Sequence, residues 1–210
     1  MFIIIEGGDA SGKTTLVENI KSFIKESDKP FKKDDIIFLK SPTPPFSDFW
    51  KTIISHKNIT PLTRFKLFHA IAYNDSEVCK AAIKNGKNVI LERYFQSTEA
   101  FNYTLDNFYN IDDPDLRSEN HVSYLGLLKP DLGFLLDVSD DKRIERMSDR
   151  FKNVFESPWE NPEFQTPLNI KLREIANREK FITIDTTIMT KPEVTKFVID
   201  KIMDLTNCQK

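Results

Sequence analysis

The chain has 210 residues, and its hydrophobic fraction of 40% with a charged fraction of 30% is typical of a folded globular protein and excludes a disordered one. This length suits one domain with a substantial core, and no internal repeat or linker divides residues 1–210. The formal net charge of −2 excludes a general attraction to nucleic acid or to an anionic membrane, so any binding of phosphate groups must depend on a local site.

The N-terminal residues combine a strand, a glycine-rich turn and the start of a helix. Residues 1–6 are an apolar run that predicts a buried parallel strand, and apolar residues recur at helical spacing over 13–26. Between them the sequence GGDASGKT at 7–14 fits the phosphate-binding pattern G-x-x-x-x-G-K-[ST]. The glycines let backbone N–H groups surround an anion, and the helix N-terminus adds unpaired donors and partial positive charge.

This loop predicts roles for its residues. Lys13 is expected to reach the outer phosphates of a nucleotide, and the Thr14 hydroxyl is expected to bind Mg²⁺. The other loop residues expected at the nucleotide are Gly7, Asp9, Ser11, Gly12 and Thr15.

The rest of the chain alternates predicted strands and helices. After a loop at 27–35, the predicted strands are 36–39, 88–91, 132–138 and 181–184. The predicted helices are 46–56, 61–85, 95–106, 122–128, 141–150, 168–178 and 192–205. Prolines exclude regular structure at 41–45, the polar segment 107–120 is expected to be a loop, and 152–167 is expected to be mobile. This alternation predicts an α/β fold with a five-stranded parallel sheet flanked by helices, and ligands at the carboxyl ends of its strands.

Glu92 and Arg93 directly follow the third predicted strand, so they are expected to face the same crevice as the phosphate loop. Glu92 could hold Mg²⁺ through a water or accept a proton from an attacking hydroxyl. Arg93 could bridge donor and acceptor phosphates and neutralise the charge between them. The alternative is a structural ion pair at the sheet edge, although two charges there would be costly to desolvate without a ligand.

Two predicted helices carry further candidate residues. On 95–106, Ser97 either begins the helix or contacts a substrate, and Asn102 is either a solvated residue or a reader of a base edge. On 141–150, arginines recur at intervals of three and four, which places them on one face of the helix. That face, formed by Arg143, Arg146 and Arg150, is either a solvated surface or part of a binding site.

The motifs together resemble the thymidylate kinase family. The resemblance rests on the loop at 7–15, on Glu92-Arg93-Tyr94 with Ser97, and on the segment KPDLGFLLDV at 129–138. Residues 181–185 resemble the last strand of that family, so the resemblance covers nearly the whole chain in order. It implies a P-loop kinase fold and transfer of the γ-phosphate of ATP, with Mg²⁺, to a deoxynucleoside monophosphate. The expected acceptor is dTMP, giving dTDP, and the expected assembly is a homodimer.

The resemblance also implies roles for individual residues. Asp9 matches a carboxylate near the acceptor sugar, and Phe68 matches an aromatic that stacks on the acceptor base, although Phe68 equally fits the core of an amphipathic helix. The arginine face looks like the start of a lid at about 146–165, which would exclude water once both substrates are bound. In this interpretation Arg143 contacts the nucleotide, and Arg146 and Arg150 act in catalysis.

The chain departs from the family pattern in three places. The loop after the second strand lacks the arginine that grips the acceptor phosphate, and Lys40 is the cation available there. An arginine expected one turn after Phe68 is absent, and Arg64, one turn earlier, could compensate. Glu92 replaces the usual aspartate, as in the Glu-Arg-Ser motif of deoxynucleoside kinases. The alternatives are therefore a deoxynucleoside kinase acting on an unphosphorylated nucleoside such as thymidine, or a nucleotide-binding module without catalysis.

Two further features bear on location. Cys79 and Cys208 lack metal-site spacing, which favours a reducing compartment, and no stretch is apolar for long enough to cross a bilayer. The apolar N-terminal run has no basic region before it and leads directly into the phosphate loop. We therefore expect a cytoplasmic protein whose partners are small nucleotides, with no nucleic acid and no membrane.

Overall fold

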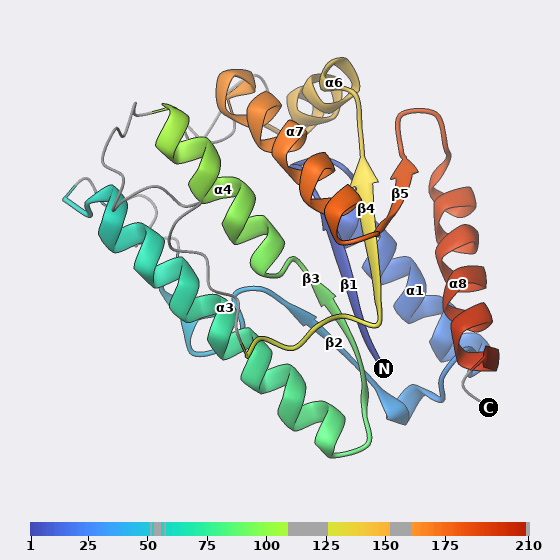
Figure 1. The fold of residues 1–210 in the computed structure, drawn as a ribbon. Helices are drawn as coiled ribbons and strands as arrows, with labels where there is room; N and C mark the ends of the chain where they lie inside the picture. Colours follow the sequence, from blue (N-terminus) through green and yellow to red (C-terminus); the bar gives the residue numbers. More distant parts are fainter. Residues whose placement is uncertain (51, 53–55, 57, 109–125, 152–160, 209–210) are drawn as a thin grey trace.

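The computed structural model describes residues 1–50, 52, 56, 58–108, 126–151 and 161–208 (Figure 1). The strands are β1 (Phe2–Gly7), β2 (Ile36–Lys40), β3 (Asn88–Glu92), β4 (Leu132–Asp137) and β5 (Ile182–Asp185). The α-helices are α1 (Lys13–Ser27), α3 (Pro61–Lys84), α4 (Phe95–Phe108), α6 (Asp140–Phe151), α7 (Pro162–Arg178) and α8 (Lys191–Cys208). Two single turns of 3-10 helix, η1 (Lys33–Asp35) and η2 (Phe46–Asp48), flank β2.

The five strands form one parallel sheet in the order β2-β3-β1-β4-β5, which confirms the predicted fold class. The central strand, β1, pairs with both β3 and β4, and all its residues are buried. Its unbroken apolar run fits this place, because a central parallel strand is covered on both faces. The two neighbours of β1 come from different parts of the chain, so a crevice opens at the carboxyl end of β1.

Helices cover both faces of the sheet (Figure 1). Alternate residues of β1 point to opposite faces, so Ile3 and Ile5 pack with α1 and α8, whereas Phe2 and Ile4 pack with residues of α3 and with the start of α4. A third cluster joins α4 and α7 over β4. The helices that carry the predicted acceptor residues therefore lie on the face opposite α1.

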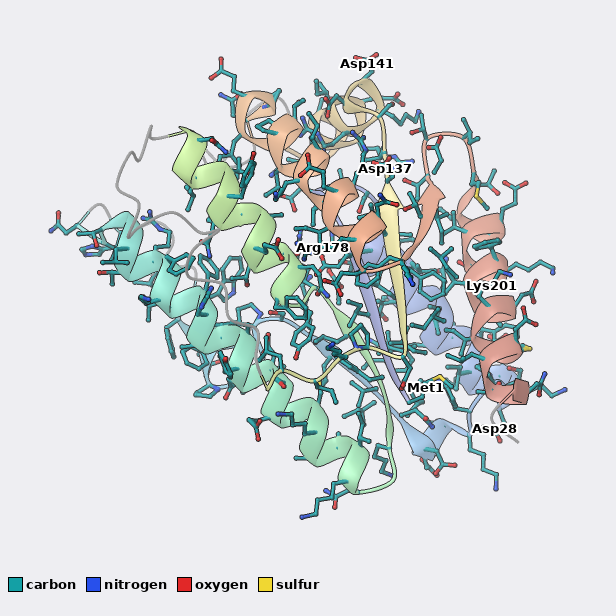
Figure 2. The ribbon with its side chains drawn as sticks, in the orientation of Figure 1. Met1, Asp28, Asp137, Asp141, Arg178 and Lys201 are labelled. Atoms are coloured by element: carbon teal, nitrogen blue, oxygen red, sulfur yellow. The ribbon has the colours of Figure 1, made fainter. Side chains whose placement is uncertain are left out.

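The functional residues gather where the strands end. Figure 2 shows Asp137 and Asp141 at this carboxyl-terminal edge of the sheet, and Met1 and Asp28 at the opposite, amino-terminal edge. The phosphate loop, Arg93 and the start of α6 all follow strand carboxyl ends, so they share the first of these edges. None of the helices in the described ranges combines the length and apolarity needed to cross a lipid bilayer.

Two predicted helices differ from the structure. The prediction 46–56 begins instead as the single 3-10 turn η2, because the Thr43 carbonyl accepts hydrogen bonds from the backbone of Phe46 and Ser47 (3.0 and 3.3 Å) in a tight turn. In the remainder of the prediction, residues 50 and 52 are helical as predicted, residue 56 is not, and residues 51 and 53–55 lie outside the described part. The prediction 122–128 is wrong at 126–128, which form a turn followed by irregular structure; its residues up to 125 lie outside the described part.

The predicted mobile segment 152–167 is wrong from residue 162 onward, because α7 begins there. The Asn161 side chain caps the helix by accepting a hydrogen bond from the Glu163 backbone (3.1 Å), and Pro162 fits the first turn, where no N–H is needed. Burial of Phe164 and Leu168 against α4 and β4 then outweighs the hydrogen bond that Pro167 cannot make. The predicted lid, 146–165, accordingly divides between α6, the start of α7, and residues 152–160, which lie outside the described part.

Candidate active site

The phosphate loop joins the end of β1 to the start of α1. Its glycines are required by geometry, since Gly12 has φ 99° and a Cβ at Gly7 would lie 2.5 Å from the Leu136 carbonyl oxygen. Ala10 also has a positive φ of 58°, which is uncommon for a residue with a Cβ. The loop thus follows the narrow path that directs backbone N–H groups toward an anion, as the motif predicts.

Lys13 is folded back onto the loop that carries it. Its Nζ donates to the carbonyl oxygens of Gly7 (2.9 Å) and Gly8 (2.6 Å) and lies 3.4 Å from the Ser11 hydroxyl. Burial, followed by the nearby Arg93 guanidinium, lowers the pKa of Lys13 to about 7. The loop carbonyls therefore hold the ammonium group at the centre of the loop.

Glu92 and Thr14 meet at the ends of β3 and the loop. The Thr14 hydroxyl lies 3.0 Å from Glu92 Oε1, and Glu92 is buried. Lys40 Nζ, on the neighbouring strand end, lies 2.9 Å from the same carboxylate oxygen. One hydroxyl and one carboxylate fit Mg²⁺, which commonly takes one or two protein oxygens together with phosphates and waters. The part of the chain that the structure describes holds no cluster of three acidic, His or Cys ligands, so phosphate oxygens would have to complete the shell.

Arg93 points toward the phosphate loop. It adopts the left-handed backbone conformation (φ 66°), which turns its side chain over the end of β1. Its NH1 donates to the Gly7 carbonyl (3.1 Å) and to the Ser97 hydroxyl (3.2 Å), and its NH2 pairs with Asp9. Glu92, Arg93 and the phosphate loop are therefore adjacent, as expected from their positions at strand ends.

Glu6, which was not predicted from the sequence as a site residue, holds the segment after β3 in position. Its carboxylate accepts hydrogen bonds from the backbone of Tyr94 (2.7 Å) and Ser97 (3.2 Å) and from the Ser97 hydroxyl (2.6 Å). Burial raises the pKa of Glu6, and the positive charge of Arg93 opposes that rise. The sequence did contain a signal for this residue, because Glu6 is the single acid at the end of the otherwise apolar run 1–6. The Ser97 hydroxyl donates to Glu6 and accepts from Arg93, so both of its partners are protein side chains.

Aromatic and buried polar side chains lie between α3, α4 and α7. The Phe68 ring is 5.3 Å from that of Phe101, which is 5.2 Å from that of Phe164. Arg64, one turn before Phe68, is buried. Asn102 is 1% exposed, and both polar atoms of its amide lack a hydrogen-bond partner. A buried amide without partners is costly, so it is a strong candidate for contact with a ligand.

The loop after β2 is anchored to α3. Asp75, fully buried, accepts hydrogen bonds from the Ser41 hydroxyl (2.5 Å) and from the Thr43 backbone (2.8 Å) and hydroxyl (2.6 Å). Burial raises the pKa of Asp75, and these three donors oppose that rise. Lys40, at the start of this loop, remains 61% exposed despite its pairing with Glu92.

A pocket of about 240 Å³ opens behind the phosphate loop. Arg146 is part of its wall, where NH1 donates to the Ala10 carbonyl (3.1 Å) and NH2 to the Thr186 carbonyl (2.6 Å). The other lining residues are Ser11, Gly12, Thr15, Leu16, Asn19, Leu136, Met189, Lys191, Val194 and Thr195. A pocket beyond the phosphate end of the loop is suited to the nucleoside part of a bound nucleotide.

The three arginines of α6 do not form one exposed face. Arg143 is completely buried, its Nε lies 3.6 Å from Asp140, and none of its guanidinium nitrogens has a hydrogen-bond partner. Helical spacing places it on the face shared with Arg146, and its complete burial shows that this face turns inward at Arg143. The side chain of Arg150 lies outside the described residues.

Comparisons with known proteins identify the family of the chain. The family model described as thymidylate kinase matches residues 5–196. A thymidylate kinase from an Exiguobacterium species is 33% identical over 160 residues, which are 71% of this chain and 69% of the relative. A probable thymidylate kinase from Methanocaldococcus jannaschii is 29% identical over 95% of this chain and 94% of its own length.

Solved structures match the fold. The thymidylate kinase of Candida albicans superposes with a TM-score of 0.71 at 22% identity, covering 98% of this chain and 92% of that one. Residues 5–196, which the family model matches, include the phosphate loop, Glu92, Arg93 and the whole sheet apart from the first residues of β1. The chain therefore belongs to the thymidylate kinase family.

Proposed function

We propose that this protein transfers the γ-phosphate of ATP to dTMP by in-line displacement, giving ADP and dTDP. Membership of the thymidylate kinase family supports a nucleoside monophosphate kinase that uses ATP. The observation that carries the proposal is the position of Arg93, whose guanidinium lies against the phosphate loop and contacts both the Gly7 carbonyl and the Asp9 carboxylate. A cation at that point is needed where two anionic substrates react with each other.

Each residue of the loop cluster has a role in this reaction. Lys13 moves from the loop carbonyls to the outer phosphates of ATP, and backbone N–H groups of residues 7–15 bind the same phosphates. Arg93 balances the charge that builds up between donor and acceptor. Thr14 and Glu92 would hold Mg²⁺, which when bound neutralises charge on the donor phosphates. The pocket behind the loop, with Arg146 in its wall, receives the adenosine.

The acceptor side is built from α3, α4 and the ends of β2 and β3. Phe68 stacks on the base, the unpartnered amide of Asn102 bonds to the base edge, and Arg64 supports the same region. Lys40, which pairs with Glu92 and is largely exposed, would replace the missing arginine at the acceptor phosphate. Asp9 and Ser97 set the position of Arg93 and border the acceptor sugar.

Several wider features belong to the same proposal. Residues 1–210 form a single kinase domain, with a lid at about 146–165 that includes Arg150. Arg143, whose side chain is buried beneath α6, supports that lid and does not contact the nucleotide directly. The protein acts in the cytoplasm as a homodimer, as its family resemblance implies, and its partners are small nucleotides.

The test is an ADP-release assay with ATP, Mg²⁺ and a panel of nucleosides and monophosphates. Turnover with dTMP and not with thymidine is the expected result, and the reverse would identify a nucleoside kinase instead. Nucleotide binding without turnover of any acceptor would contradict catalysis altogether. The variant Lys13→Ala should lose this turnover. Its matched control is Lys25→Ala, which removes an exposed lysine from the same helix.

A further inference from the structure

One face of α7 presents two buried carboxamides to the phosphate loop. Gln165 and Asn169 are four residues apart, so they lie on the same side of the helix, and they are 2% and 5% exposed. Both side chains reach residues of the loop on the acceptor side of Lys13.

Gln165 contacts Asp9 at two points. Its Nε2 donates to Asp9 Oδ2 (3.2 Å), and its Oε1 accepts from the Asp9 backbone N–H (3.4 Å). The other carboxylate oxygen, Oδ1, pairs with Arg93. The two oxygens of Asp9 are thus held from opposite sides, one by a helix and one by the residue that follows β3.

Asn169 fixes the path of the loop beside this contact. A Cβ at Gly8 would lie 2.1 Å from Asn169 Oδ1, so glycine at this position lets the loop and the Asn169 side chain pack closely together. The Nδ2 atom of Asn169 is buried and lacks a hydrogen-bond partner. The amide therefore acts through close packing on the backbone just before Asp9.

The helix that carries both amides is firmly anchored. Leu168 and Leu172 are buried in the cluster over β4, and Arg178 forms a two-pronged ion pair with Glu99 of α4 (2.7 and 2.8 Å). Arg173 pairs with Asp137 at the end of β4 (2.8 Å). Both ion pairs lie in the C-terminal part of α7, and the buried leucines lie between them and Gln165 or close to it.

We propose that Gln165 is a positioning residue for phosphoryl transfer, which holds Asp9 so that Arg93 stays between the two substrates. Asn169 assists by fixing the loop at Gly8. The inference rests on the proposed function, because the acceptor is what Asp9 and Arg93 face. Gln165 itself touches neither substrate, so its effect on rate passes entirely through Asp9.

The variant Gln165→Leu removes both contacts while keeping the buried volume similar. A hydrogen bond to a charged group that is lost at an active site typically lowers the rate by about 10- to 100-fold. We expect that loss in kcat with dTMP, with the KM for ATP changed by less than about twofold. A purely structural role would instead lower the melting temperature and leave the kinetic constants of the folded fraction unchanged.

A double-mutant cycle gives the decisive measurement. In an Asp9→Ala background, Gln165→Leu should cost no further activity, because the residue through which it acts is already missing. Independent losses that multiply in the double variant would overturn the inference. Asn177→Leu, which replaces an exposed amide on the same helix, is the matched control and should leave kcat unchanged.

A second variant covers the case in which Gln165→Leu does not fold. Gln165→Asn keeps the amide but withdraws it by one methylene, and it should show a smaller loss of kcat in the same direction. Turnover equal to that of the wild type in this folded variant would also overturn the inference. If the wild-type protein phosphorylates no acceptor, the proposed function fails; if it does and the cycle is additive, only the role of Gln165 fails.

Discussion

The donor side and the acceptor side of this site are built by different means. In the proposed reaction, donor phosphates meet one continuous segment, residues 7–15, through backbone N–H groups and Lys13. The proposed acceptor site is made of single side chains from α3, α4, α7 and two strand ends, and among these the buried amide of Asn102 has no hydrogen-bond partner. A backbone cradle tolerates side-chain variation, whereas an assembly of separate side chains can change its ligand through one substitution.

The largest effect is expected from the donor side. Lys13→Ala removes the one side chain of the cradle that contacts outer phosphates, and kcat should fall by about 10³-fold. ADP release at saturating ATP and dTMP measures it, with Lys25→Ala as the control that should match the wild type. Activity retained in Lys13→Ala would show that the cradle depends on backbone groups alone.

Arg93 connects the two sides, and its replacement should have the next largest effect. Arg93→Lys keeps the charge but loses the fork that reaches Gly7, Ser97 and Asp9 together. We expect kcat to fall by about 10²-fold with little change in either KM. A change confined to the KM for ATP would instead assign this residue to the donor side.

Asn102 tests the acceptor side alone. Asn102→Leu should raise the KM for dTMP by roughly 10- to 30-fold and leave the KM for ATP unchanged. Because the buried amide has no partner without substrate, the same change should increase the free energy of unfolding by about 1 kcal/mol. Kinetics and denaturant unfolding measure the two effects, and a loss of stability would contradict the assignment.

The smallest effect is a pH dependence of donor binding. Lys13 has a pKa of about 7 in the free protein, and bound phosphates favour its charged form. The Kd for ATP should therefore increase by up to about tenfold between pH 6 and pH 8, as neutral lysine must regain a proton to bind. Calorimetry in buffers of different ionisation enthalpy measures that uptake, and a flat profile in Lys13→Ala is the control.

The same shift affects folding with the opposite sign. The unfolded chain keeps the proton on Lys13 up to its ordinary pKa of 10.5, so between pH 7 and 10.5 it binds more protons than the folded chain. The contribution of this group to stability without nucleotide therefore rises across that window.

The difference between the two sides also explains what the sequence could predict. The loop at 7–14 and Arg93 were predictable because one is a local pattern and the other follows from where parallel strands end. Gln165 was missed because Pro162 and Pro167 suggest an irregular segment, and only tertiary burial makes α7 begin there. Arg143 was placed correctly on a helix face, but spacing does not tell whether a face meets solvent or another helix.

The left-handed backbone at residue 93 has a consequence for engineering. An arginine in this conformation costs about 1 kcal/mol that glycine would avoid, and its contacts with Gly7, Ser97 and Asp9 offset that cost. A screen for heat resistance alone therefore tests the balance between strain and contacts at residue 93, and not the role proposed for its guanidinium in the reaction. Thermostable descendants of this enzyme should be selected for turnover and heat resistance together.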